Sequence, residues 1–273
     1  LCMFAQFFVA PLFTESATTR ELNAVDAEYE MQRQTDMRKL YQVKKSTANP
    51  QHPFHKFEAG SKQTLCNDHR EKNIDLQCEL FKFYNKYYSA DLMNLCVVGP
   101  YSLDAMQQWV VEMFSGIPNR NCSHPSTAYS NIPVLLPNQM GYRSHVVSVM
   151  DIRHLNLSWP IPPLKKFYRS DPAAYICHLL SHEGKGSLFS LLRRKGWANY
   201  LTSGVDSFET FAFFEVSIVL TSDGVHHVDE MIGLVYDYIY LIKTKGLEEW
   251  IFEELAVLAE LSFRFIERSE PCD

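Results

Sequence analysis

Apolar residues recur at helical spacing over much of the chain, and each such segment predicts an amphipathic helix. The clearest spans residues 76–88, where the apolar positions are Leu76, Leu80, Phe83, Tyr84 and Tyr87. Ser102 is suited to cap a helix over residues 102–114, because its hydroxyl can accept a hydrogen bond from a first-turn N–H. Further helices are predicted over residues 172–194, 225–243 and 247–268.

A longer helix, with its charges on one side, is predicted over residues 14–46. Thr18 or Thr19 is expected to cap it. Glu21 then falls in the first turn, where a carboxylate suits the positive end of the helix dipole.

Shorter apolar runs predict a few strands. Residues 93–98 precede Gly99-Pro100 and are expected to form a buried strand, residues 211–221 another, and residues 145–161 an extended segment. The Pro-, Asn- and Ser-rich stretch 117–144 is the best linker candidate, with a domain boundary near residue 128. Helices with few, short strands in both halves indicate an α+β fold.

Composition limits the classes of partner. The 273 residues include 46% hydrophobic residues and carry a formal net charge of −6, which suits a globular protein and argues against binding nucleic acid through its phosphates. No apolar stretch is long enough to predict a membrane span. The seven cysteines are widely spaced, without a Cys-x-x-Cys pair, so we expect reduced thiols and a cytoplasmic location.

The first ten residues are mostly apolar but carry neither an initiating Met nor a basic leader. We therefore expect the chain to begin inside a domain, partway along a buried element, as a fragment of a longer protein.

Two acidic residues are the first candidates for chemistry. Glu21 and Glu28 are seven residues apart, which is nearly two helical turns, so they project from the same face with Val25 between them. One such carboxylate can bind a cation while the other accepts a hydrogen bond from a histidine ligand. The spacing alone favours a solvated acidic face over a metal site, and both interpretations stay open.

The amino-acid sequences of several segments resemble those of the insulin-degrading enzyme and nardilysin family of inverzincin zinc metallopeptidases. The resemblance keeps its order from about Phe4 to Arg268. It rests on Phe4-Ala5-Gln6-Phe7-Phe8, Pro11-Leu12-Phe13, Arg20-Glu21 to Glu30, Asn49-Pro50-x-His52-Pro53-Phe54-x-Lys56-Phe57, Met150-Asp151-Ile152-Arg153, Pro160-Ile161-Pro162 and His182-Glu183-Gly184-x-Gly186-Ser187-Leu188.

In that family, a His-x-x-Glu-His helix and a later glutamate hold Zn²⁺. The resemblance implies that Glu28 is that metal ligand and that Glu21 is the carboxylate supporting catalysis. The chain contains no His-x-x-Glu-His, and a catalytic zinc needs three protein ligands. We therefore expect a peptidase by lineage, whose zinc site is incomplete in this chain and which by itself neither retains zinc nor hydrolyses peptides.

The resemblance also implies substrate contacts. His178 and Glu183, with the strand-like segment Leu201, Thr202, Ser203, Gly204 and Val205, match an exosite that holds the N-terminal end of a peptide by strand addition. Members of the family tend to have glycine where Ser181 and Ser203 stand. Tyr41 matches a position near the scissile bond, and Arg38 replaces an aromatic residue nearby.

Histidine pairs offer alternatives. His178 and His182 have the i, i+4 spacing of metal ligands, so a plain structural helix and a metal site also remain open for that segment. The pairs His52-x-x-His55 and His226-His227 are expected at the surface or in turns.

By resemblance, the fold comprises two incomplete inverzincin-type domains, 1–128 and 129–273, each a mostly antiparallel sheet covered by helices. The implied function is a zinc metalloendopeptidase degrading short peptides and peptide hormones, with a possible homodimer in the full-length enzyme. The alternative is a non-catalytic module of the same fold that binds peptides or partner subunits.

Overall fold

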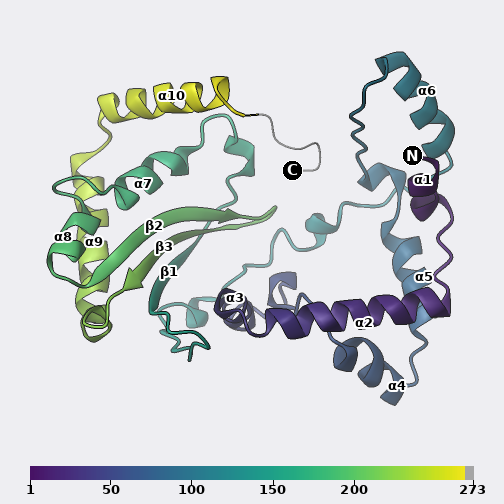
Figure 1. Cartoon of the computed structure of the whole chain (residues 1–273), viewed down its shortest axis with the longest axis horizontal. Coiled ribbons are helices and arrows are strands. Elements are labelled where there is room, and N and C mark those ends of the chain that lie inside the picture. Colours follow the sequence, from purple (N-terminus) through teal and green to yellow (C-terminus); the bar gives the residue numbers. More distant parts are fainter. Residues whose placement is uncertain (268–273) are drawn as a thin grey trace. The chain divides into compact units, whose positions relative to one another are not determined.

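The computed structural model describes residues 1–267, apart from the side chain of Arg70 (Figure 1). The described chain divides into two compact units, Leu1–Val149 and Met150 onward. Arg268, the predicted end of the last helix, and Cys272 lie outside the described residues. None of the described helices has the length and apolar character needed to cross a bilayer.

Helices and irregular segments make up the first unit (Figure 1). The predicted helices over 76–88 and 102–114 are confirmed, and the side chains of Asp75 and Ser102 cap them. The α-helices of this unit are α1 (Cys2–Val9), α2 (Glu15–Gln32), α3 (Asp36–Ser46), α4 (Asp68–Glu71), α5 (Leu76–Tyr87) and α6 (Leu103–Phe114).

The first apolar residues form α1, but they are not a buried element as predicted. Ala5 is fully buried, whereas Met3 and Phe7 are 85% and 66% exposed. A hydrogen bond to its backbone and a contact between aromatic rings hold α1 in place. The Tyr84 hydroxyl donates to the Phe8 carbonyl at 2.6 Å, and the Phe4 ring lies 6.3 Å from that of Phe114.

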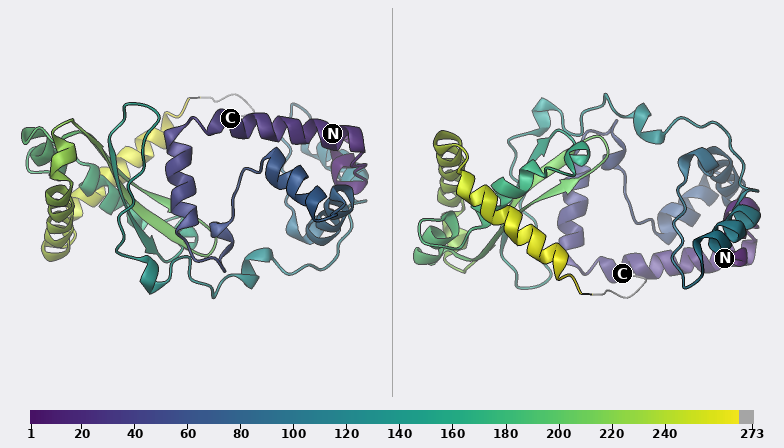
Figure 2. Two further views of the ribbon diagram at one scale, coloured as in Figure 1. Left: turned by 90° about the horizontal axis from the view of Figure 1, so that it is seen from below. Right: turned by 90° about the horizontal axis from the view of Figure 1, so that it is seen from above.

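The single helix predicted over residues 14–46 is wrong, because the chain bends between α2 and α3 (Figure 2). Thr14 caps α2 by accepting a hydrogen bond from the Ala17 N–H, so neither Thr18 nor Thr19 is the cap. Glu21 therefore lies beyond the first turn. At the start of α3, the buried Asp36 carboxylate accepts the Val149 N–H at 2.7 Å, a contact distant in sequence that fixes the bend.

The strand predicted over residues 93–98 is absent from the structure. Leu95 is 43% exposed and Val98 is 87% exposed, and the described residues of Leu1–Val149 contain no paired strand. A strand needs a partner for its backbone hydrogen bonds, which an apolar run by itself does not supply.

The stretch 117–144 is mostly irregular but is anchored to the first unit. Asn49 donates from its backbone N–H to Val134 and from its side-chain amide to Pro133, both at 2.9 Å, and Val134 is buried. The division between the compact units therefore follows this stretch. The domain boundary near residue 128, which concerns the domains of the resembling family, stays a prediction.

The second unit is built on a three-stranded antiparallel sheet of order β1-β3-β2, which confirms the α+β fold class (Figure 1). Its register places Leu157 opposite Val216, and both Leu155 and Leu201 opposite Ile218. The elements are β1 (His154–Ile161), α7 (Pro172–Ser181), α8 (Leu188–Arg194), β2 (Ala198–Ser207), β3 (Ala212–Leu220), α9 (Val228–Lys245) and α10 (Glu249–Arg264).

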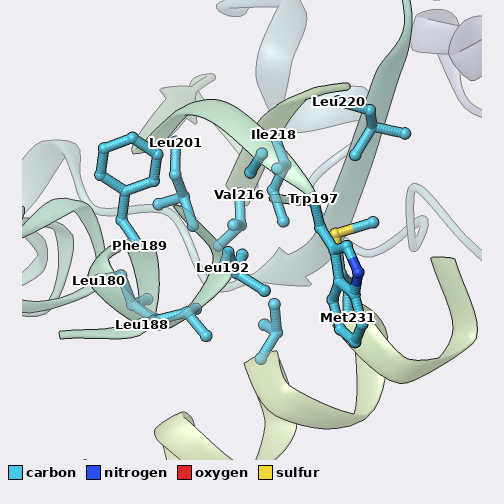
Figure 3. Close-up of a cluster of buried hydrophobic side chains, with 12 residues drawn as sticks. Leu180, Leu188, Phe189, Leu192, Trp197, Leu201, Val216, Ile218, Leu220 and Met231 are labelled. Atoms are coloured by element: carbon cyan, nitrogen blue, oxygen red, sulfur yellow. The ribbon is translucent and has the colours of Figure 1, made fainter. Parts of the chain in front are cut away.

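One face of this sheet forms the core (Figure 3). Along β3 the side chains of Val216, Ile218 and Leu220 alternate toward this face, as the period of two in a strand requires. Residues of α7, α8 and α9, including Leu180, Leu192, Met231 and Val235, pack against it.

The helix predicted over residues 172–194 is interrupted between α7 and α8. Residues 182–187 form a turn in which Gly186 has a φ of +92°, a conformation that favours glycine. Ser187 then caps α8 by accepting the Ser190 N–H at 3.1 Å. The predicted strand over 211–221 and the last two helices are confirmed, with ends shifted by a few residues.

Candidate functional site

The α2 helix presents the two carboxylates that the sequence singled out. Glu21 and Glu28 are both exposed, and none of the 18 residues of α2 is buried. One Glu28 oxygen accepts a hydrogen bond from the Gln32 side-chain amide at 2.8 Å. The nearby Asp26 is used differently, because it accepts the backbone N–H of Lys62 at 2.7 Å. Glu28 thus lies within reach of solvent, whereas Tyr29 of the same helix is half-buried against Phe57.

The described residues do not make a complete zinc site. Within residues 1–267, no group of three or more His, Cys, Asp or Glu side chains is placed to hold a metal ion. Catalytic zinc takes three protein ligands, and α2 offers one candidate ligand with a supporting carboxylate. The roles assigned to Glu28 and Glu21 stay predictions.

Tyr41 lies on α3 in a defined environment. Its ring meets Phe54 edge-on at 6.0 Å, and the Lys45 ammonium lies 5.5 Å from the Tyr41 ring and 4.9 Å from the Phe54 ring. Lys45 is buried and pairs with Glu58 at 3.3 Å, as does Arg38. These contacts hold the half-buried Tyr41 in place, and its contact with substrate stays a prediction.

Of the two positions expected for His52, the surface or a turn, the structure shows the turn: the side chain is buried, with 3% of its surface exposed. Its Nδ1 accepts the Phe54 N–H at 3.1 Å and caps a short 3₁₀ helix, Pro53–His55. Burial lowers the pKa of the His52 imidazole below its ordinary value, because the charged form loses its hydration. The side chain supports the fold beneath α3.

The predicted exosite residues lie on α7, the following turn and β2. Because β3 is the middle strand, β2 is an edge of the sheet, as strand addition requires. Leu201 is buried in the core, whereas Thr202, Ser203 and Val205 are half-buried. The structure thus places this segment at a sheet edge, while peptide binding there stays a prediction.

His178 lies on α7, and Glu183 lies in the turn that follows it. His178 is half-buried on α7, and its ring centroid lies 5.6 Å from that of the exposed His182. Glu183 is exposed and lines an open hollow of about 430 Å³ beside the start of β2. The other lining residues are Phe189, Arg193, Gly196, Ala198, Asn199, Tyr200 and Thr221.

One feature of the edge was not expected from sequence. The Ser203 N–H donates to the Ser181 hydroxyl at 2.7 Å, and the two hydroxyls lie 2.8 Å apart. Both serines stand where the resembling family tends to have glycine, and their side chains meet because α7 folds back beside β2.

Comparisons with known proteins all relate this chain to peptidases of one family. A family model described as the peptidase M16 inactive domain matches residues 78–256. Insulin-degrading enzymes from Drosophila melanogaster and Homo sapiens are 42% and 40% identical over 98% of this chain. A nardilysin-like protein from Arabidopsis thaliana is 38% identical over 99% of it. The chain spans 26–27% of the length of these relatives.

Solved structures agree. A crystal structure of pitrilysin superimposes with a TM-score of 0.89 and 26% identity, over 98% of this chain and 28% of that chain. A peptidase M16 inactive domain from Pseudomonas fluorescens shares the fold, with a TM-score of 0.63 and 17% identity over 97% of this chain and 60% of that chain.

The fold and the sequence relationships define the class as that of the M16 peptidases, with an α+β fold shared with pitrilysin. The chain belongs to the M16 peptidase family, and its matched segment is of the type described as inactive.

Proposed function

We propose that this chain is part of a zinc metalloendopeptidase that degrades short peptides such as peptide hormones. Within that enzyme Glu28 is a zinc ligand and Glu21 is the carboxylate that supports a histidine ligand. By itself the chain neither holds zinc tightly nor cleaves peptides, because the described residues supply too few ligands.

The observation that carries this proposal is the exposure of both carboxylates along α2. The helix buries no side chain, although the aligned relatives are about four times longer than this chain. Because both carboxylates are exposed, they are available to a further segment of the longer protein. The names of the relatives, insulin-degrading enzymes, support a peptide hormone as the class of substrate.

A chimera tests the proposal. This chain replaces the aligned segment of the Drosophila insulin-degrading enzyme, and zinc content and cleavage of an internally quenched fluorogenic peptide are measured. We expect about one zinc ion per chain and peptide cleavage. Glu28→Gln should lower zinc affinity on the order of tenfold or more, and Glu21→Gln should lower affinity or activity by roughly 10- to 100-fold.

Glu30→Gln is the matched control. Glu30 is also exposed on α2, and it pairs with Arg33 at 2.9 Å in a surface interaction that contributes little. Its variant should keep zinc and activity. Equal zinc affinity in the Glu28→Gln and Glu30→Gln chimeras would refute the metal role of Glu28. Sub-micromolar zinc binding by the chain alone would refute the proposal that its site is incomplete.

The β2 edge favours a second contribution to the same function, the binding of an extended peptide along residues 201–205. Main-chain hydrogen bonds to the outward groups of β2 would hold the peptide, and Glu183 would receive its terminal ammonium. This contribution does not require zinc, so it also serves the alternative of a non-catalytic peptide-binding module. A homodimer of the full-length enzyme and a cytoplasmic location are further proposals from the sequence.

A further inference from the structure

The backbone of β2 alternates between its partner strand and its open edge. Ser203 lies opposite Val216 of β3 in an antiparallel pair. In such a pair, alternate residues direct their N–H and C=O groups toward the partner, and the others direct them away. Because the Ser203 N–H donates to Ser181, its backbone faces away from β3. The same alternation turns Leu201 and Val205 outward.

The hydroxyl pair of Ser181 and Ser203 has a defined direction of hydrogen bonding. Ser203 donates its hydroxyl proton to the Cys177 carbonyl at 2.8 Å. A serine has one hydroxyl proton, so Ser181 is the donor in the 2.8 Å contact between the two hydroxyls. The bonds therefore run from the Ser203 N–H to Ser181, from Ser181 to the Ser203 hydroxyl, and from there to Cys177.

We infer that Ser181 closes the β2 edge at Ser203 and so limits peptide binding along it. Its hydroxyl oxygen takes the position that a carbonyl oxygen of an added strand would take on the Ser203 N–H. A peptide carbonyl must displace Ser181, and that displacement also breaks the bond that Ser181 donates to the Ser203 hydroxyl. This inference rests on the proposed binding of peptides to this edge.

The position of α7 explains why these two serines meet. The α7 helix lies beside β2 (Figure 1), and its residues Cys177 and Ser181 are hydrogen-bonded to Ser203. Cys177, Ser181 and Ser203 are all half-buried, so the hydrogen bonds are only partly exposed to competing water. Such linked bonds reinforce one another, which makes the closure stronger than a single surface hydroxyl contact.

Hydrogen exchange of the full chain tests the closure without any ligand. Ser181→Ala removes the acceptor at a helix end, where alanine is well tolerated. We expect the protection of the Ser203 amide to fall on the order of tenfold. The Thr202 amide, which faces β3, should be unchanged. Unaltered protection at Ser203 would overturn the inference.

Peptide binding tests the consequence. The probe is a fluorescein-labelled peptide of alternating Val and Thr residues, and its N-methylated analogue reports whether main-chain bonds are used. Ser181→Ala should bind the probe more tightly than the parent chain, on the order of tenfold, which is the net worth of about one hydrogen bond. Ser158→Ala is the control, because it removes a hydroxyl from β1. That hydroxyl donates to Glu215 on β3, the strand that separates β1 from β2.

The outcomes distinguish two claims, that Ser181 closes the β2 edge and that peptides bind to this edge. Tighter binding in Ser181→Ala alone, abolished by N-methylation, supports the closure. Equal, measurable binding by the parent chain and Ser181→Ala overturns the closure while leaving the peptide-binding edge intact. Absence of binding in both, with the Ser203 amide newly exposed in Ser181→Ala, overturns the proposed peptide-binding edge and with it the role of Ser181 in limiting binding.

Discussion

At the scale of single residues, folding removes the His52 imidazole from water. The side chain is buried and uses Nδ1 to accept the Phe54 N–H. Burial lowers the pKa of His52 in the folded chain, so the unfolded chain binds a proton more readily. This difference couples stability to pH.

His52 should make the chain less stable in mild acid. The stabilisation is complete above the unfolded pKa of about 6.5 and is lost as the pH falls through the lower, folded pKa. Urea unfolding of the first unit should therefore show a lower midpoint at about pH 5.5 than at about pH 7.5. His52→Asn, which keeps an oxygen for the Phe54 N–H, should reduce that difference.

His145→Asn is the matched control for this prediction, since His145 is exposed in the same unit. Its variant should keep the pH dependence of the parent chain. If His52→Asn and His145→Asn give the same dependence, burial of His52 is not its origin.

At the scale of elements, the junction between β3 and α9 depends on close backbone approach. Gly224 begins the short 3₁₀ helix Gly224–His227, and a Cβ atom there would lie 2.0 Å from the Trp197 carbonyl oxygen. Thr221 fixes the same turn, because its hydroxyl accepts the Gly224 N–H and its backbone N–H donates to Trp197. Only glycine fits without a backbone shift.

Gly224→Ala should therefore destabilise the chain by roughly 1–3 kcal/mol or more, the range for forcing atoms into a packed region. Gly233→Ala is its matched control, because Gly233 lies on α9 with nothing within 4 Å of the added Cβ. That change should stabilise the chain by about 1 kcal/mol through helix propensity. The free energies of unfolding in urea check both signs, and a neutral Gly224→Ala would contradict the close approach.

At the scale of the whole molecule, apolar burial is unevenly distributed. Among the described residues, a contiguous core of twelve buried residues lies in the second unit, between the sheet and helices α7, α8 and α9. In the first unit, buried apolar residues such as Ala5, Phe54, Tyr84 and Met106 are scattered among several helices. Local stability follows the density of buried apolar contacts.

Amide hydrogen exchange should therefore be slower in the second unit. We expect β3 and α9 to be the most protected segments, and α1 and α2 to exchange faster by on the order of tenfold or more, because α2 has no buried side chain. Mass spectrometry of the full chain at peptide resolution measures this. Equal protection of α2 and α9 would show that burial does not set local stability here.

Much of the local structure could be predicted from sequence. The apolar period identified α5, the hydroxyl of Ser102 identified the start of α6, and the run 211–221 identified β3, because each signal lies within a few residues of the element it specifies. The segments around Glu21, Glu28 and the glycine-containing turn after His182 identified the family, because a sequence resemblance is also read from residues that are close together in the chain. The prediction of one continuous helix over residues 14–46 was wrong, because the contact between Asp36 and Val149 at the bend is not local in sequence.

The sequence by itself determined helices α5, α6, α9 and α10, the middle strand, the family and the absence of a His-x-x-Glu-His motif. Only the tertiary structure decided that residues 93–98 have no strand partner among the described residues, that His52 is buried, and that Ser181 occupies the Ser203 amide. Helix signals are local, whereas strand pairing, burial and side-chain hydrogen bonds depend on which distant segments fold together. That is why the candidate residues were visible in the sequence and their environments were not.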